Sequence, residues 1–201
     1  MGREAQHVKR DPTSGVKYPK LPKTGGFVPW SEDDIATYER RWPLGTRQRV
    51  WLDVLAYTGL RRGDVVQLGR QHVRDGVAYI KTEKTDTQVA LPILPLLAQT
   101  LAAGPCGDLT FIIGANGRPL TKAGFGKEFR QACRAAGLKK RSAHGLRKAA
   151  ATRAAISGAT LAQLNAIFGW TGAKMALHYI ETADRERLAG DAMVKLNRGT
   201  K

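Results

Sequence analysis

The residues with the clearest chemical potential lie in the C-terminal third of the chain. His144 and Arg147 are three positions apart on a predicted helix, so their side chains share one face and can address one ligand. Ser142 is placed to cap the start of that helix, where free N–H groups and the helix dipole favour an anion. Tyr179 lies nine residues beyond Trp170, which follows the next short helix. Imidazole, guanidinium and phenol are three of the groups needed to attack a phosphodiester without a metal.

Further groups suited to the same chemistry occur earlier in the chain. Arg61 comes directly after the glycine stop of a very apolar helix, at a rigid junction where a second guanidinium could bind a phosphate oxygen. Asp64 is placed to hold such an arginine. Lys84 begins a predicted hairpin turn and could protonate a leaving oxygen if nearby cations lower its pKa. The indole N–H of Trp170 could donate to a phosphate. Considered singly, each of these residues is better explained by a structural role, as a solvated charge or a packing aromatic.

Composition favours a polyanionic partner. The 201-residue chain has 33 Lys and Arg against 17 Asp and Glu, a net charge of +16, which indicates nucleic acid first and an anionic membrane surface second. No apolar run is long enough to span a bilayer, and the N-terminus lacks the apolar core of a signal peptide. Two cysteines and four histidines without metal-ligand spacing predict a reducing cytoplasm, no metal site and no cofactor.

The positive charge is concentrated between Thr121 and Thr160. That segment holds ten basic residues and one acid, Glu128, whereas a solvated surface would mix both signs. A surface that faces nucleic acid explains the imbalance better. The candidate DNA-binding residues are Lys122, Lys127, Lys139, Lys140, Arg141 and Lys148.

Hydrophobic periodicity predicts a mostly α fold with one small antiparallel sheet, an α+β domain. Residues 1–30 are basic and rich in proline and are expected to form an interdomain linker, with the domain itself over 31–201. A polar turn at 84–87 joins two strands into a hairpin. Helices are expected at 31–41, 46–57, 63–68, 125–136, 142–158, 160–169 and 175–180 and after Asp184, and strands at 77–80, 89–93 and 109–113.

Taken together and in this order, the residues resemble the active site of the tyrosine recombinase (phage integrase) family. The motifs are Thr-Gly-Leu-Arg before a hairpin, Lys-Thr followed by Val-x-Leu-Pro-Ile, Ala-His-Gly-Leu-Arg, and a tyrosine nine residues after Gly-Trp. The resemblance runs from about Trp30 to Met193. It implies Arg61 and Arg147 as a phosphate clamp, Lys84 as proton donor to the departing 5′ oxygen, His144 as acid/base, Trp170 as hydrogen-bond donor and Tyr179 as the nucleophile that forms a 3′-phosphotyrosyl bond.

The same resemblance implies cytoplasmic, nucleoid-associated action on DNA by a bacterial or phage-encoded enzyme that is a monomer in solution and a tetramer on DNA. The chain departs from the family in two ways. Trp170 stands where most members carry histidine, and the N-terminal core-binding domain of full-length relatives is expected to be absent. Weak, salt-dependent DNA binding is therefore expected. A C-terminal helix presents Leu188, Ala192, Met193 and Leu196, which could pack within the chain or on a neighbouring protomer.

Two other functions remain open from sequence. A non-catalytic helix-turn-helix module within 160–180 would explain the charge, and it requires the 175–180 helix to protrude. A type IB topoisomerase shares the chemistry and would relax supercoils instead of exchanging strands.

Overall fold

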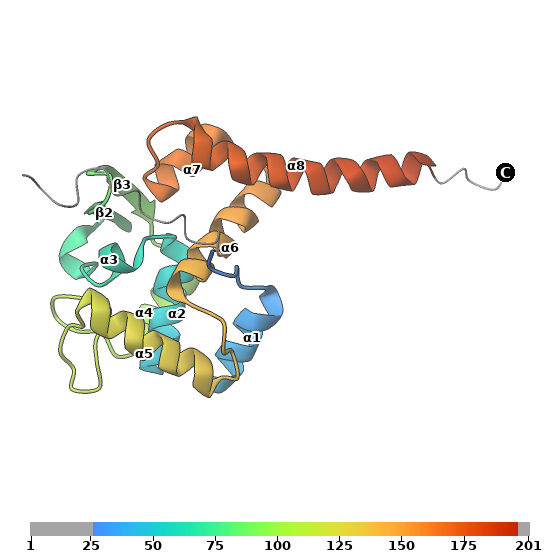
Figure 1. Cartoon of the computed structure of the whole chain (residues 1–201). Coiled ribbons are helices and arrows are strands. Elements are labelled where there is room, and N and C mark those ends of the chain that lie inside the picture. Colours follow the sequence, from blue (N-terminus) through green and yellow to red (C-terminus); the bar gives the residue numbers. More distant parts are fainter. Residues whose placement is uncertain (1–25, 197–201) are drawn as a thin grey trace, which may run out of the picture.

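A computed structural model describes residues 26–196, so of the linker predicted over residues 1–30 the part over 1–25 lies outside the described residues. The fold is mostly helical with one small antiparallel sheet, as the sequence predicts, and Figure 1 shows the sheet at one edge of the helical body. The helices are α1 (Glu32–Arg41), α2 (Arg47–Thr58), α3 (Arg62–Val65), α4 (Pro95–Ala103), α5 (Lys122–Ala135), α6 (Ala143–Ile156), α7 (Leu161–Phe168) and α8 (Ala173–Leu196), with a 3-10 turn, η1 (Arg70–His72), and the strands are β1 (Val73–Arg74), β2 (Val77–Lys81) and β3 (Gln88–Pro92).

Local signals in the sequence define most helix ends. Ser31 begins α1 in a reciprocal capping box with Asp34, and Thr160 and Gln163 form the same motif at α7. The α2 helix ends at Gly59, whose φ of 61° lies in the left-handed region that glycine adopts without strain. Because Gly59 is the junction to Arg61, this turn helps to set where that arginine enters the site.

The larger core is built on α2, which is buried along most of its length. Trp51, Leu52 and Leu55 are each at most 1% exposed, and Phe125 and Phe129 of α5 pack into the same cluster. The rings of Trp51 and Phe125 form a T-shaped contact, with ring centroids 5.8 Å apart. The spacing of four between the two phenylalanines therefore marks the buried face of α5, as predicted.

The sheet has the antiparallel order β1-β2-β3, and Ile80 pairs with Val89 in the predicted hairpin. β1 was not expected, although Asp75-Gly76, both with positive φ, is a strong two-residue hairpin signal. The strand expected at 109–113 is wrong. Phe111, Ile112 and Ile113 are buried and Leu109 is exposed, but the segment forms only an isolated bridge between Ile113 and Pro119. One of its amide groups, Phe111 N–H, donates instead to Leu68 O.

The last three helices enclose a second, smaller core. Leu164, Phe168 and Ala176 are at most 2% exposed there. The expected break before Asp184 is wrong: α8 is continuous from Ala173, because residues 173–189 contain no glycine or proline to end a helix. Figure 1 shows the later part of α8 extending away from the body.

The predicted helix-turn-helix alternative is not favoured, because its recognition segment is the start of α8 and is packed into this core through Ala176. Of the expected apolar tail face, Ala192 and Met193 are exposed, and the side chains of Leu188 and Leu196 lie outside the described part.

The sequence did not predict α4, although Pro95 at its first turn is a typical helix start. None of the described helices is both long and apolar enough to cross a membrane.

Candidate active site

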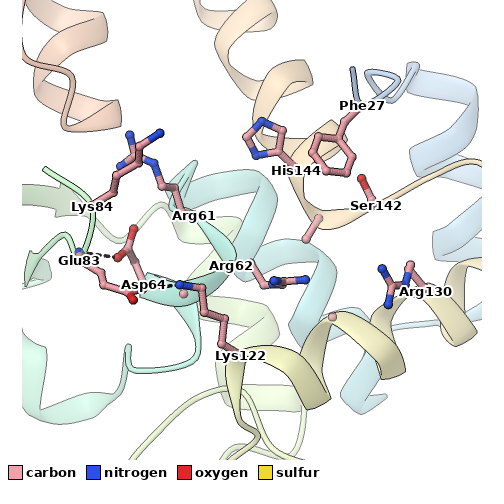
Figure 2. A pocket seen from close by; sticks show the side chains of 13 residues that line it. Phe27, Arg61, Arg62, Asp64, Glu83, Lys84, Lys122, Arg130, Ser142 and His144 are labelled. Atoms are coloured by element: carbon pink, nitrogen blue, oxygen red, sulfur yellow. Dashed lines mark hydrogen bonds and ion pairs between the residues drawn. The ribbon is translucent and has the colours of Figure 1, made fainter. Parts of the chain in front are cut away.

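An open pocket lies where α3, the β2–β3 turn and the starts of α5 and α6 meet (Figure 2). It gathers four of the residues predicted to be catalytic or supporting, Arg61, Asp64, Lys84 and His144. These residues come from three separate segments of the chain, so the tertiary fold alone brings them together. Figure 2 shows Arg61 and Lys84 at one side of the pocket and His144 with Phe27 at another.

Arg61 is held at the junction between α2 and α3 with an unused donor. Its Nη1 atom is buried and has no hydrogen-bond partner among the described residues. The neighbouring Asp64 is 2% exposed, and its Oδ1 accepts a hydrogen bond of 2.9 Å from the backbone N–H of Glu83. Asp64 thus fixes the turn that carries Lys84, whereas sequence predicted that it would hold an arginine. A buried guanidinium N–H without a partner is costly unless a ligand accepts from it.

The turn that carries Lys84 is fixed on its other side as well. Thr85 Oγ1 donates a hydrogen bond of 3.0 Å to Gly169 O, the residue before Trp170. Thr85 also shares a hydrogen bond of 2.8 Å with the hydroxyl of Thr82, which is 1% exposed. The turn is therefore attached both to the α3 side of the pocket and to the α7–α8 junction. Sequence analysis did not identify Thr85 as a contributor to the site.

Arg147 is buried, 5% exposed, and joins the two cores. Its Nη1 donates to Gly59 O at the end of α2, and its Nη2 donates over 2.8 Å to Phe168 O at the end of α7. Burial, together with the nearby Arg61 charge, lowers the pKa of Arg147 to about 10, so the side chain remains a cation at neutral pH. The sequence predicted that Arg147 binds a phosphate. The structure adds a second role for Arg147, in which donors on both terminal nitrogens hold the carbonyls at the ends of α2 and α7.

His144 begins α6 and is covered on one side by the segment before α1. The rings of Phe27 and His144 have centroids 4.8 Å apart. The segment reaches this position because Gly145 has no side chain: a Cβ there would overlap Val28 O. Trp30 anchors it through a 2.9 Å hydrogen bond from Nε1 to Ser142 O. Burial, followed by the charges of Arg147, Lys148, Arg61 and Lys84, lowers the pKa of His144 below 6.5 and favours the neutral imidazole.

Tyr179 lies outside the pocket lining, in a stack of aromatic rings beside Arg147. Its ring is stacked on Trp170 with centroids 5.5 Å apart and an interplanar angle of 6°, and Trp170 is stacked on Phe168 at 4.8 Å. Arg147 Cζ lies 5.8 Å from the Trp170 ring centroid. Burial raises the pKa of Tyr179, and the charge of Arg147 opposes that rise. The phenol is therefore protonated at neutral pH and needs a base to become a nucleophile.

The predicted DNA-binding cations do not form one group. Lys122 lines the pocket, but it pairs with Glu83 at 2.7 Å. Arg141 is paired with Asp34 at 2.6 Å and is only partly exposed. The charge of Lys148 reaches His144. The others, Lys127, Lys139 and Lys140, are exposed.

The pocket also contains groups that sequence analysis did not place in the site: Phe27, Arg62, Glu83 and Arg130. Arg62 is adjacent to a predicted site residue, and this adjacency was a usable signal. Nothing local in the sequence marks Phe27. No group of three or more His, Cys, Asp or Glu side chains within 26–196 is arranged to hold a metal ion; the described partners of Asp64 and Glu83 are a backbone amide and Lys122, respectively.

Comparison with known proteins assigns the chain to a family. The Phage integrase family pattern matches residues 32–186, well over half of the chain. The chain therefore belongs to the phage integrase family, whose members are tyrosine recombinases.

Individual relatives agree with this assignment. The integrase of Mycobacterium phage L5 is 27% identical over an alignment that covers 74% of this chain and 47% of the relative, so the chain spans about half of that protein. The fold is similar to that of XerA recombinase, with a TM-score of 0.67, 22% identity, and coverage of 92% of this chain and 68% of XerA. It is also similar to lambda integrase in a tetramer bound to a Holliday junction, with a TM-score of 0.64, 20% identity, and coverage of 84% and 53%.

Proposed function

We propose that this chain is the catalytic domain of a site-specific DNA recombinase that cuts and rejoins DNA through a 3′-phosphotyrosyl intermediate. Family membership supports the reaction class. The observation that carries the proposal is that Nη1 of Arg61 is buried and has no hydrogen-bond partner within residues 26–196, in a pocket that also holds Lys84 and His144. Such a donor is suited to a phosphodiester oxygen, which accepts from a guanidinium more strongly than water does.

In the proposed mechanism, Arg61 and Arg147 stabilise the charge that develops on the phosphate oxygens. His144, neutral because its pKa is lowered, accepts a proton during attack by Tyr179 and later returns one. Lys84 protonates the departing 5′ oxygen. Each cleavage exchanges one phosphodiester for one phosphotyrosyl ester, so the bond energy is conserved, and the cations provide charge stabilisation without a metal.

Trp170 is proposed to orient the nucleophile in addition to donating a hydrogen bond. Its parallel stack with Tyr179 limits the directions in which the phenol can point. The proposed partner is double-stranded DNA, bound by a homotetramer, in keeping with the lambda integrase tetramer of similar fold. The excess of positive charge supports the same partner.

The test is the formation of a covalent protein–DNA adduct on nicked suicide duplexes at low salt. Tyr179→Phe should abolish the adduct while DNA binding is retained. Tyr79→Phe is the matched control, because Tyr79 is 41% exposed on β2 and lies outside the site; this variant should form adduct at the wild-type rate. An adduct that survives in Tyr179→Phe would refute the proposed nucleophile.

A further inference from the structure

The pocket has a second basic region that the proposed chemistry does not use. Arg62, Lys122 and Arg130 line it, and Figure 2 shows Arg62 and Arg130 on the side away from Lys84. Arg61 and Arg62 are consecutive, yet Figure 2 shows Arg61 directed toward Lys84 and Arg62 directed toward α5 and Arg130. The two neighbouring guanidinium groups thus serve different parts of one pocket.

Two arginines in this region, Arg62 and Arg130, are available to bind an anion. The carboxylate of Glu83 faces the same space, but it is paired with Lys122 Nζ at 2.7 Å. Neither Arg62 nor Arg130 forms an ion pair with a residue in the described part of the chain, and both are exposed. The region therefore carries a net positive charge that is open to an anion from solution.

The position of Arg62 is set by a glycine. Gly126 lies inside α5 and is buried, and a Cβ there would overlap Arg62 Nη1 and come within 3.1 Å of its Cδ. Glycine is among the least favourable residues in a helix interior, so its presence at this point needs a compensating reason. The absence of a side chain at Gly126 lets Arg62 lie directly across the helix. An arginine that merely extended into solvent would not need this space.

We propose that Arg62 and Arg130 form a second phosphate subsite, which binds a DNA backbone phosphate other than the one that is cleaved. This proposal rests on the proposed function. The two planar guanidinium groups can each present paired N–H donors to phosphate oxygens. Arg61 would hold the reacting phosphodiester while this subsite fixes the position of the strand beside it. Positioning of this kind needs no base contact and is independent of DNA sequence.

The first experiment measures binding of a short mixed-sequence duplex at several salt concentrations, in the Tyr179→Phe background so that no covalent step contributes. The slope of log K against log salt is negative, and each lost phosphate contact should reduce its magnitude by about 0.9. Arg62→Ala is expected to reduce the magnitude by about this amount, and Arg62→Ala with Arg130→Ala by about twice it. Arg40→Ala, an exposed arginine of α1 outside the pocket, is the control for loss of one charge. Slopes of the Arg62 and Arg130 variants equal to that of the control would overturn the subsite.

The second experiment keeps every charge and changes only the space under Arg62. Gly126→Ala should fold with an unchanged or higher melting temperature, because only the flexible side chain of Arg62 must move. The variant should nevertheless bind DNA more weakly, because Arg62 is displaced. Wild-type affinity in a folded Gly126→Ala protein would overturn the role of the glycine.

Failure of the recombinase proposal is distinguishable from failure of the subsite. Failure of the former appears as a missing covalent adduct in the wild-type protein, whereas failure of the latter appears as unaltered binding slopes.

Discussion

The two arginines of the proposed phosphate clamp should respond very differently to removal. Arg147 donates to two backbone carbonyls and joins the two cores, whereas Arg61 has a buried nitrogen without a partner among residues 26–196. Arg61→Ala should therefore remove activity without loss of stability. Arg147→Ala should remove both.

The magnitudes follow from the hydrogen bonds. Bonds from a charged donor contribute about 1.5–3 kcal/mol each, so the two bonds of Arg147 amount to about 3–6 kcal/mol of the total of about 5–15 kcal/mol typical of a domain. Removing Arg61 deletes a buried, unpaired donor, whose desolvation cost is about 1–3 kcal/mol. That gain offsets the lost packing of the side chain, and repulsion with Arg147 also disappears. The free energy of unfolding of Arg61→Ala should stay within about 1 kcal/mol of wild type.

Urea unfolding gives the stability of each variant, and adduct formation on a suicide duplex gives the activity. Both substitutions should reduce the adduct rate by about 100-fold or more, because transition-state charge loses a main partner. Arg147→Lys keeps the charge but cannot donate to both carbonyls in the same geometry, so it should recover only part of the stability. The reasoning is wrong if Arg61→Ala destabilises the protein as much as Arg147→Ala.

Two further perturbations test the surroundings of the site. Phe27→Ala should raise the pKa of His144 toward 6.5, since burial is the main cause of its lowering, and NMR titration of the imidazole measures the shift. The unfolded chain binds a proton at His144 more readily than the folded protein does, so the free energy of unfolding should fall as the pH drops below about 6.5. Urea unfolding at several pH values measures this pH dependence, and His144→Gln should reduce it. Thr85→Val removes the hydrogen bonds to Gly169 O and to the Thr82 hydroxyl, so it should lower the free energy of unfolding by about 1–3 kcal/mol and slow adduct formation without weakening DNA binding. Equal adduct rates would exclude a positioning role for the turn that carries Lys84.

Much of the fold was predictable because its signals are local. The capping boxes, the Gly59 stop and the spacing of Phe125 and Phe129 depend on residues within a turn or two of each other. The strand predicted at 109–113 failed because its hydrogen bonding depends on a distant segment. Residues 109–113 are apolar like a strand, but one of their amides pairs with Leu68, more than forty positions earlier, and no local pattern records that pairing. The segment 173–196 was predicted as two helices because Asp184 can cap the start of a helix. Residues 173–189 contain no glycine or proline that would end the first helix, so the two are continuous.

The candidate site likewise has features that the sequence predicted and features that only the tertiary structure decided. The types and order of Arg61, Lys84, His144, Arg147 and Tyr179 were determined by sequence, because the chemistry of phosphoryl transfer restricts which side chains can perform it. Tertiary structure alone decided that Arg147 also connects two helix ends, that Asp64 binds the backbone of Glu83, and that Phe27 covers His144. These contacts join residues far apart in the chain, and they form only where packing brings the segments together. A side chain's chemistry is present in the sequence, whereas its partners depend on which distant segments become its neighbours.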